Sequence, residues 1–162
     1  MAWLYHSRRL TWLCVALLAW SIPAAADDVL ALQVLRGSGA PAVTSLADLD
    51  DLAQTEFTTT TIWTDGDVTF SGVSLLHFLK AHDVTSGRVR LTALNDYSVE
   101  MPLAELEQDA PIVATRINDA LIGVRDKGPF WLVYPYDSAP RFRTETVFAR
   151  SIWQLNKVTV LD

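Results

Sequence analysis

The sequence is nearly free of cysteine, and this absence excludes several kinds of site. Cys14 is the only cysteine among the 162 residues, and it lies in an N-terminal segment with the features of a removable export signal. Without that segment the chain has no thiol, so it can form no disulfide, anchor no iron–sulfur cluster and offer no thiolate to a metal. His77 and His82 are five residues apart and do not share a helix face as an i, i+4 metal pair would. We therefore expect no metal site made by the side chains of this domain.

Long apolar runs are also missing. The longest, Leu10 to Trp20, is shorter than the roughly 20 residues that a membrane span requires. It follows Arg8 and Arg9 and precedes a Pro-Ala-Ala-Ala end at Ala26, an arrangement typical of a secretory signal peptide. We predict a signal peptide at residues 1–26, a mature domain at 27–162, a periplasmic location and no membrane span after cleavage. An uncleaved anchor is the alternative, and a weak twin-arginine signature leaves the export route open.

Positive charge is in short supply. The chain has 13 lysines and arginines against 19 aspartates and glutamates, and its net charge of −6 becomes −8 if Arg8 and Arg9 leave with the leader. An acidic chain lacks the basic face that nucleic acid or anionic lipid requires, so we expect neither as a partner. Half of the residues are apolar and no Pro/Gly/Ser-rich linker is present, which favours a single domain with one core.

Turn residues separate many short apolar segments. Alternation and β-branched residues predict strands over 29–35, 56–63, 68–70, 88–94, 97–101, 111–117, 120–124, 130–134 and 152–161. A short helix is expected over Leu46 to Ala53, capped by Thr44 or Ser45 with Asp48 as the capping-box acid. Two more are expected to begin at Gly72 and after Pro102. The pattern predicts a sheet-rich α+β domain.

Four segments, taken in order, resemble the molybdopterin-binding domain of the sulfite oxidase family. Phe70 to Leu79 is similar to its aromatic-x-Gly-Val-x-Leu-x-x-Leu-Leu segment, and Val89 to Pro102 to its strand followed by Asp-Gly-Tyr and an aliphatic-Pro helix entry. Gly128 to Pro135 is similar to Gly-Pro-x-Arg-Leu-Val-x-Pro, and Ser151 to Val160 to its closing strand. The likeness covers nearly all of the mature chain. It implies a mixed, sheet-rich sulfite oxidase-like fold with short peripheral helices.

Departures from the family pattern affect the expected function. Family enzymes hold molybdenum through a cysteine shortly before the Gly-Val segment, where this chain has Thr58 to Trp63. A threonine hydroxyl is a hard ligand and does not replace a soft thiolate. Trp131 stands where the family has arginine, and Asp96-Tyr97 lacks the intervening glycine. The resemblance therefore implies the fold more strongly than it implies catalysis.

We accordingly expect a non-catalytic ligand-binding or accessory module without a cofactor. Its expected partner is a small anionic ligand or a membrane-bound signalling or redox protein. The alternative is a molybdopterin-dependent oxidoreductase whose metal site is completed by Thr59, Thr61 or solvent. The sequence shows no nucleophile elbow, catalytic triad or Gly-rich phosphate loop.

Three arginines are candidate ligand-binding residues. In a strand, Arg141 and Arg143 would project from one face, where guanidinium groups suit a carboxylate or a phosphate such as a pterin pyrophosphate. A solvated loop that offsets local acids is the alternative. The strands predicted at 111–117 and 120–124 flank Asn118-Asp119 and are expected to form a hairpin. Arg116 belongs to a looser basic group around this hairpin, where an ordinary exposed hairpin is the simpler interpretation.

A predicted turn supplies two further candidates. Asp96 and Tyr97 could line the mouth of a pocket, although a turn aspartate that accepts backbone N–H groups is the simpler account. Trp63, Trp131 and Trp153 are expected in the core, because buried aromatic side chains supply much of a small domain's apolar area.

Overall fold

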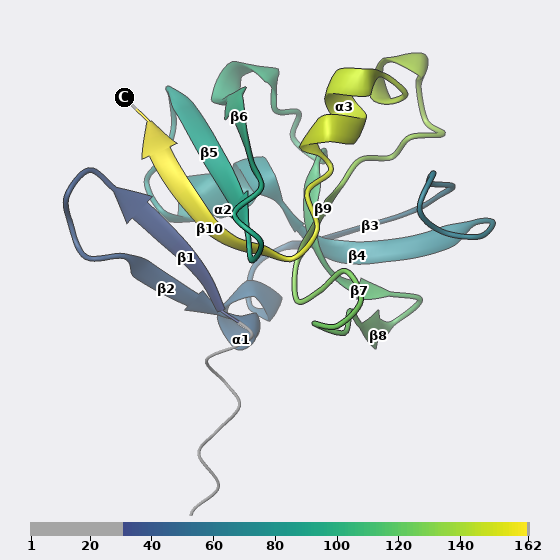
Figure 1. The fold of residues 1–162 in the computed structure, drawn as a ribbon, viewed down its shortest axis with the longest axis horizontal. Helices are drawn as coiled ribbons and strands as arrows, with labels where there is room; N and C mark the ends of the chain where they lie inside the picture. Colours follow the sequence, from purple (N-terminus) through teal and green to yellow (C-terminus); the bar gives the residue numbers. More distant parts are fainter. Residues whose placement is uncertain (1–30, 162) are drawn as a thin grey trace, which may run out of the picture.

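Five strands form the first sheet in the order β2-β1-β10-β5-β6 (Figure 1). The computed structural model describes residues 31–161, so the predicted signal peptide lies outside the described residues. The strands are β1 (Ala31–Arg36), β2 (Ala42–Ser45), β5 (Arg88–Ala93), β6 (Ser98–Pro102) and β10 (Leu155–Leu161). Only the β1–β10 pair is parallel, and the other neighbours pair antiparallel. The last strand thus lies in the middle of the sheet, between the first strand and the β5–β6 hairpin.

The second sheet is antiparallel throughout. Its strands are β3 (Gln54–Thr59), β4 (Val68–Ser74), β7 (Ile112–Ile117), β8 (Ala120–Leu121) and β9 (Trp131–Val133). The first four follow the order β3-β4-β7-β8, and β9 also pairs with β7. One mixed sheet and one antiparallel sheet, with short helices outside them, confirm the predicted sheet-rich α+β class.

Short helices connect the strands. They are α1 (Leu46–Asp50), α2 (Leu75–Ala81), α3 (Glu145–Arg150) and the 3-10 turns η2 (Leu103–Glu105) and η3 (Pro140–Phe142). Ser45 caps α1: its hydroxyl accepts the Asp48 N–H at 3.1 Å, while the Asp48 carboxylate accepts the Ser45 N–H at 2.8 Å. This reciprocal arrangement confirms the predicted capping box. No helix within residues 31–161 is long and apolar enough to span a membrane.

The helix predicted to begin at Gly72 is a strand there instead. Gly72 to Ser74 belong to β4, and the Ser74 hydroxyl caps α2 by accepting the His77 N–H at 3.4 Å. A Cβ on Gly72 would lie 2.1 Å from the carbonyl oxygen of Val113 on β7. The glycine is therefore required by close backbone pairing rather than by a helix start. His77 on α2 is exposed.

One apolar core joins both sheets. Phe70 on β4, Leu91 on β5 and Trp131 on β9 are fully buried, as is Phe78 on α2. Toward one end of this core, the β5–β6 turn, the loop after β3 and the segment after α3 converge, and they form the site described next.

Candidate functional site: an aromatic pocket

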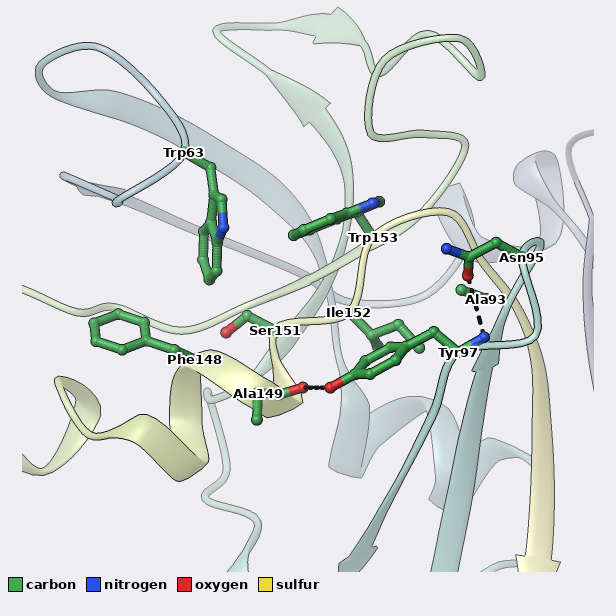
Figure 2. A pocket seen from close by; sticks show the side chains of 9 residues that line it. All are labelled: Trp63, Ala93, Asn95, Tyr97, Phe148, Ala149, Ser151, Ile152 and Trp153. Carbon is green, nitrogen blue, oxygen red and sulfur yellow. Dashed lines mark hydrogen bonds between the residues drawn. The ribbon is translucent and has the colours of Figure 1, made fainter.

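Three segments far apart in the sequence form an open pocket of about 240 Å³ (Figure 2). Trp63 comes from the loop at 60–67, Asn95 and Tyr97 from the β5–β6 turn, and Phe148 and Trp153 from α3 and the segment after it. The remaining wall consists of small or aliphatic residues and one hydroxyl, namely Ala93, Ala149, Ile152 and Ser151. None of the nine lining side chains is a lysine, arginine, aspartate, glutamate or histidine.

Trp63 is the centre of the aromatic cluster beside the pocket. Its ring lies edge-on to Trp153 at 5.8 Å, to Phe148 at 5.9 Å and to Trp131 at 5.9 Å between centroids. It also contacts Tyr136 at 6.2 Å. Edge-to-face geometry is favoured by the ring quadrupoles and adds to the apolar contact. The cluster therefore fixes Trp63 although it stands in a loop.

Hydroxyl groups give this loop its shape. The Thr61 hydroxyl accepts the N–H of Trp63 at 3.0 Å and lies 2.8 Å from the Thr64 hydroxyl. Such side-chain-to-backbone bonds replace a backbone turn locally. The threonines that the sequence suggested for a strand thus hold a turn from position 60 onward.

A buried hydrogen-bond chain supports the pocket from behind. The Tyr136 phenol donates to the Ser151 hydroxyl at 2.7 Å, and this hydroxyl donates to the Val147 carbonyl oxygen at 2.8 Å. Burial raises the pKa of Tyr136 to about 12, since the phenolate would be poorly solvated there. The Ser151 hydroxyl therefore both accepts and donates a hydrogen bond within the wall of the pocket.

Two polar side chains face the pocket. The Asn95 Oδ1 accepts the Tyr97 N–H at 3.1 Å, and the Tyr97 hydroxyl donates to the Ala149 carbonyl oxygen at 3.1 Å. Because a backbone N–H needs an acceptor, the oxygen of Asn95 must face Tyr97, and its NH₂ group is turned away from that bond (Figure 2). The indole N–H groups of Trp63 and Trp153 are further donors of the lining.

A second cluster lies where the family resemblance places the metal-binding cysteine. The Asp137 carboxylate accepts the Thr60 N–H at 2.5 Å, the Thr60 hydroxyl at 2.9 Å and the Thr59 hydroxyl at 3.2 Å. It also pairs with the Arg143 guanidinium. In return the Asp137 N–H donates to the Thr59 hydroxyl at 3.1 Å. The hydroxyl groups of Thr59 and Thr60 thus bond to the Asp137 carboxylate, which also pairs with Arg143.

These donors do not fit ligation of molybdenum in the manner of the family. They are hard hydroxyl and carboxylate oxygens that already bond one another, whereas the family ligand is a soft thiolate. Across residues 31–161, no three or more histidine, cysteine, aspartate or glutamate side chains are placed to hold a metal ion.

The structure does not bring Arg141 and Arg143 to one face. Pro140 begins the turn η3, so the strand geometry on which a shared face depended is not formed. Arg141 makes two bonds of 2.9 Å to the Glu107 carboxylate, and this guanidinium lowers the pKa of Glu107. Arg143 pairs with Asp137 instead. The two arginines line different hollows of the surface.

Arg116 lies on β7 and is also paired. It makes two bonds of 2.6 and 2.7 Å to Asp50 at the end of α1, and hydrogen bonding to this arginine lowers the pKa of Asp50. Of the five candidate residues, Tyr97 alone lines the aromatic pocket. Asp96 occupies the turn with φ +65°, and the side chain that accepts the turn N–H is that of Asn95.

Several residues of the site were missed by reasoning from the sequence. Phe148 lies in α3, a helix that was not predicted although Thr144 caps it by accepting the Val147 N–H at 3.3 Å. A threonine before Glu145 was the signal that could have found it. Trp131 is in the core as predicted, but Trp153 is 37% exposed and lines the pocket. No local pattern indicates Asp137.

Comparisons with known proteins add a fold relationship. The crystal structure of the sulfane dehydrogenase SoxCD from Paracoccus pantotrophus is similar, with a TM-score of 0.59 and 15% identity over 82% of this chain. The fold is distantly related to that of a sulfite oxidase-family enzyme. This chain spans 38% of the length of that SoxCD chain. Comparison with protein-family models finds no match, and comparison with curated proteins finds none either.

Proposed function

We propose that this chain is an exported, non-catalytic domain that binds a small molecule in its aromatic pocket, on a fold related to that of a molybdopterin enzyme family. The observation that carries the proposal is the Asp137 cluster. Where a thiolate would hold the metal, Thr59 and Thr60 bond to a carboxylate, and hard oxygen donors are a poor substitute for sulfur.

The pocket supports binding as the retained function. It is open, its aromatic walls are held by the Trp63 cluster, and two of its large side chains, Tyr97 and Trp153, are 49% and 37% exposed. Exposed aromatic side chains around a concave surface are common at binding sites. The absence of charged side chains from the nine lining residues leaves no general acid or base there besides the Tyr97 phenol.

The proposed location rests on the N-terminal segment of the sequence. A charged start, an apolar run and a small-residue end at Ala26 support export to the periplasm. There the domain would deliver or report its ligand to a membrane-bound signalling or redox partner. The anionic ligand suggested by the arginines has less support, because Arg116, Arg141 and Arg143 each pair with a carboxylate.

A molybdopterin-dependent oxidoreductase is the second candidate, and the fold relationship alone favours it. Purification from the periplasm of a host that makes the cofactor separates the two proposals. We expect molybdenum by mass spectrometry, and pterin fluorescence after denaturation, at the level of a signal-peptide-exported control protein. Stoichiometric molybdenum together with pterin would contradict the non-catalytic function.

A further inference from the structure

The chemistry of the pocket lining specifies a class of ligand, and this inference rests on the proposed binding function. We infer that the pocket takes an uncharged, planar ring that carries a hydrogen-bond acceptor such as a carbonyl oxygen or a ring nitrogen. Four properties of the site lead to this class: its size, its aromatic walls, its donors and its lack of charge.

The size limits the ligand to one small ring system. The pocket measures about 240 Å³, which is below the range of roughly 300–1,000 Å³ usual for drug-sized ligands. It is open on one side, so a substituent on the ring can extend into solvent. A large dinucleotide would not be enclosed by these walls.

The walls favour a flat ligand. Trp63, Trp153, Tyr97 and Phe148 line the space (Figure 2), and the Trp63 contacts fix two of the other rings at 5.8 and 5.9 Å. Aromatic rings gain from stacking or edge contacts with another planar π-system, beyond the gain from apolar burial. A saturated ring of the same volume would lack this contribution to the binding free energy.

The donors select for an acceptor on the ligand. The Asn95 Oδ1 already accepts the Tyr97 N–H, whereas its NH₂ group has no partner among the described residues and is available to a ligand. Trp63 and Trp153 each contribute an indole N–H, which can only donate. None of these three side-chain nitrogens donates to another group within the part of the chain that the structure describes. The Tyr97 hydroxyl already donates to Ala149.

The electrostatics disfavour an ionised ligand. The nine lining residues include no charged side chain. Next to the pocket, Arg150 is paired with Glu105 at 2.5 Å, and Asp96 adjoins Asn95 in a domain whose net charge is negative. A carboxylate or phosphate would therefore be desolvated in the pocket without a cation to compensate its charge, and this would weaken binding. A cation could be attracted by the rings, but it would meet the N–H donors of Asn95, Trp63 and Trp153.

Four probes of similar size test the class by titration of tryptophan fluorescence, with calorimetry as a second readout. They are benzamide, benzoate, benzyltrimethylammonium and cyclohexanecarboxamide. We expect saturable binding of benzamide, and affinities about tenfold or more weaker for the other three. Tighter binding of benzoate or of the ammonium probe would overturn the ligand class and leave the binding function intact. No saturable binding of any probe would overturn the binding function as well.

Two variants test the donors directly. Asn95→Asp keeps an oxygen for the Tyr97 N–H but replaces the NH₂ group with a second oxygen, and we expect it to weaken benzamide binding about tenfold. Trp153→Phe keeps a ring and removes the N–H, so a loss of about threefold is expected. The matched control is Asn118→Asp, since Asn118 caps the Thr69 N–H at 3.0 Å in the β7–β8 turn and does not line the pocket. Benzamide affinity that stays unchanged in Asn95→Asp, with the fold intact by circular dichroism, would overturn the inference.

Discussion

Asp137 and Thr60 are joined by two hydrogen bonds across 77 positions of sequence, from the Thr60 N–H at 2.5 Å and from its hydroxyl at 2.9 Å. The two oxygens of one carboxylate thereby fix the point at which β3 ends and the loop that carries Trp63 begins. The resemblance of the sequence to the sulfite oxidase family would place that family's metal-binding cysteine in this same segment. In this chain the segment is fastened by a carboxylate, and the adjacent tryptophan becomes part of an aromatic wall.

The Asp137 bonds predict a measurable loss of stability on truncation. Asp137→Ala leaves the Thr60 N–H and Arg143 without their partner, and we expect the free energy of unfolding in urea to fall by about 1–2 kcal/mol. Asp65→Ala is the control, because Asp65 is an exposed carboxylate of the same loop. Equal stability of the two variants would contradict the assigned role.

The aromatic cluster predicts an order among tryptophan variants. Trp63 contacts four aromatic rings, so Trp63→Ala should lower the free energy of unfolding by about 3 kcal/mol. Trp153→Ala should cost about 1 kcal/mol, because 37% of that residue is already exposed. Chemical denaturation followed by circular dichroism measures both. The reverse order would mean that Trp63 is not the centre of the cluster.

Gly72 predicts a severe effect from a single methyl group. In Gly72→Ala the new Cβ would lie 2.1 Å from the Val113 carbonyl oxygen and 2.8 Å from the Ala114 Cα, so β4 and β7 would have to separate. We expect a loss of about 3 kcal/mol or more, or an insoluble protein. Gly66→Ala is the control: its φ is +65° with nothing within 4 Å, and it should cost about 1 kcal/mol. Thermal unfolding distinguishes the two, and similar midpoints would refute the close approach.

The Asp50–Arg116 pair predicts a pH-dependent contribution to stability. The pKa of Asp50 is lowered from 3.8 in the folded protein, chiefly by hydrogen bonding to Arg116, so the folded state binds the proton less readily than the unfolded state. The pair's contribution is therefore present above pH 3.8 and is lost as the pH falls through the folded value. Both side chains are about one-third exposed, which keeps the contribution below about 1 kcal/mol. Unfolding of Asp50→Asn and the unaltered protein should differ at pH 7 and converge in acid; a constant difference would exclude ionisation as the cause.

Local chemistry made part of the fold predictable. The Ser45–Asp48 capping box and the Asn118–Asp119 hairpin involve residues a few positions apart, and both formed as expected. The prediction of a helix start at Gly72 was wrong because a glycine can mark either a helix start or a close approach between strands. Pairing of β4 with β7, which is distant in sequence, requires the glycine here. The helix α3 was missed because a six-residue segment between turns carries too little periodicity.

The candidate site was less predictable than the fold. Tyr97 was identified through its turn, but the loop threonines appeared as strand residues because β-branched side chains favour strands. Arg141 and Arg143 were expected on one strand face, whereas Arg141 pairs with Glu107 and Arg143 with Asp137. Arg116, expected on an exposed hairpin, pairs with Asp50. The Asp50–Arg116 and Glu107–Arg141 pairs join residues far apart in the sequence, and such pairing leaves no local signature.

By itself the sequence determined which side-chain groups this protein can offer to a metal, the class of its fold and the cap that begins its first helix, because these depend on residue identity and near neighbours. The tertiary structure alone decided which side chains meet: Asp137 with Thr60, Trp63 with Trp153, and Asn95 with an open aromatic space. Such contacts arise when separate strands and loops pack on one core, and nothing in the order of residues along the chain specifies that geometry locally.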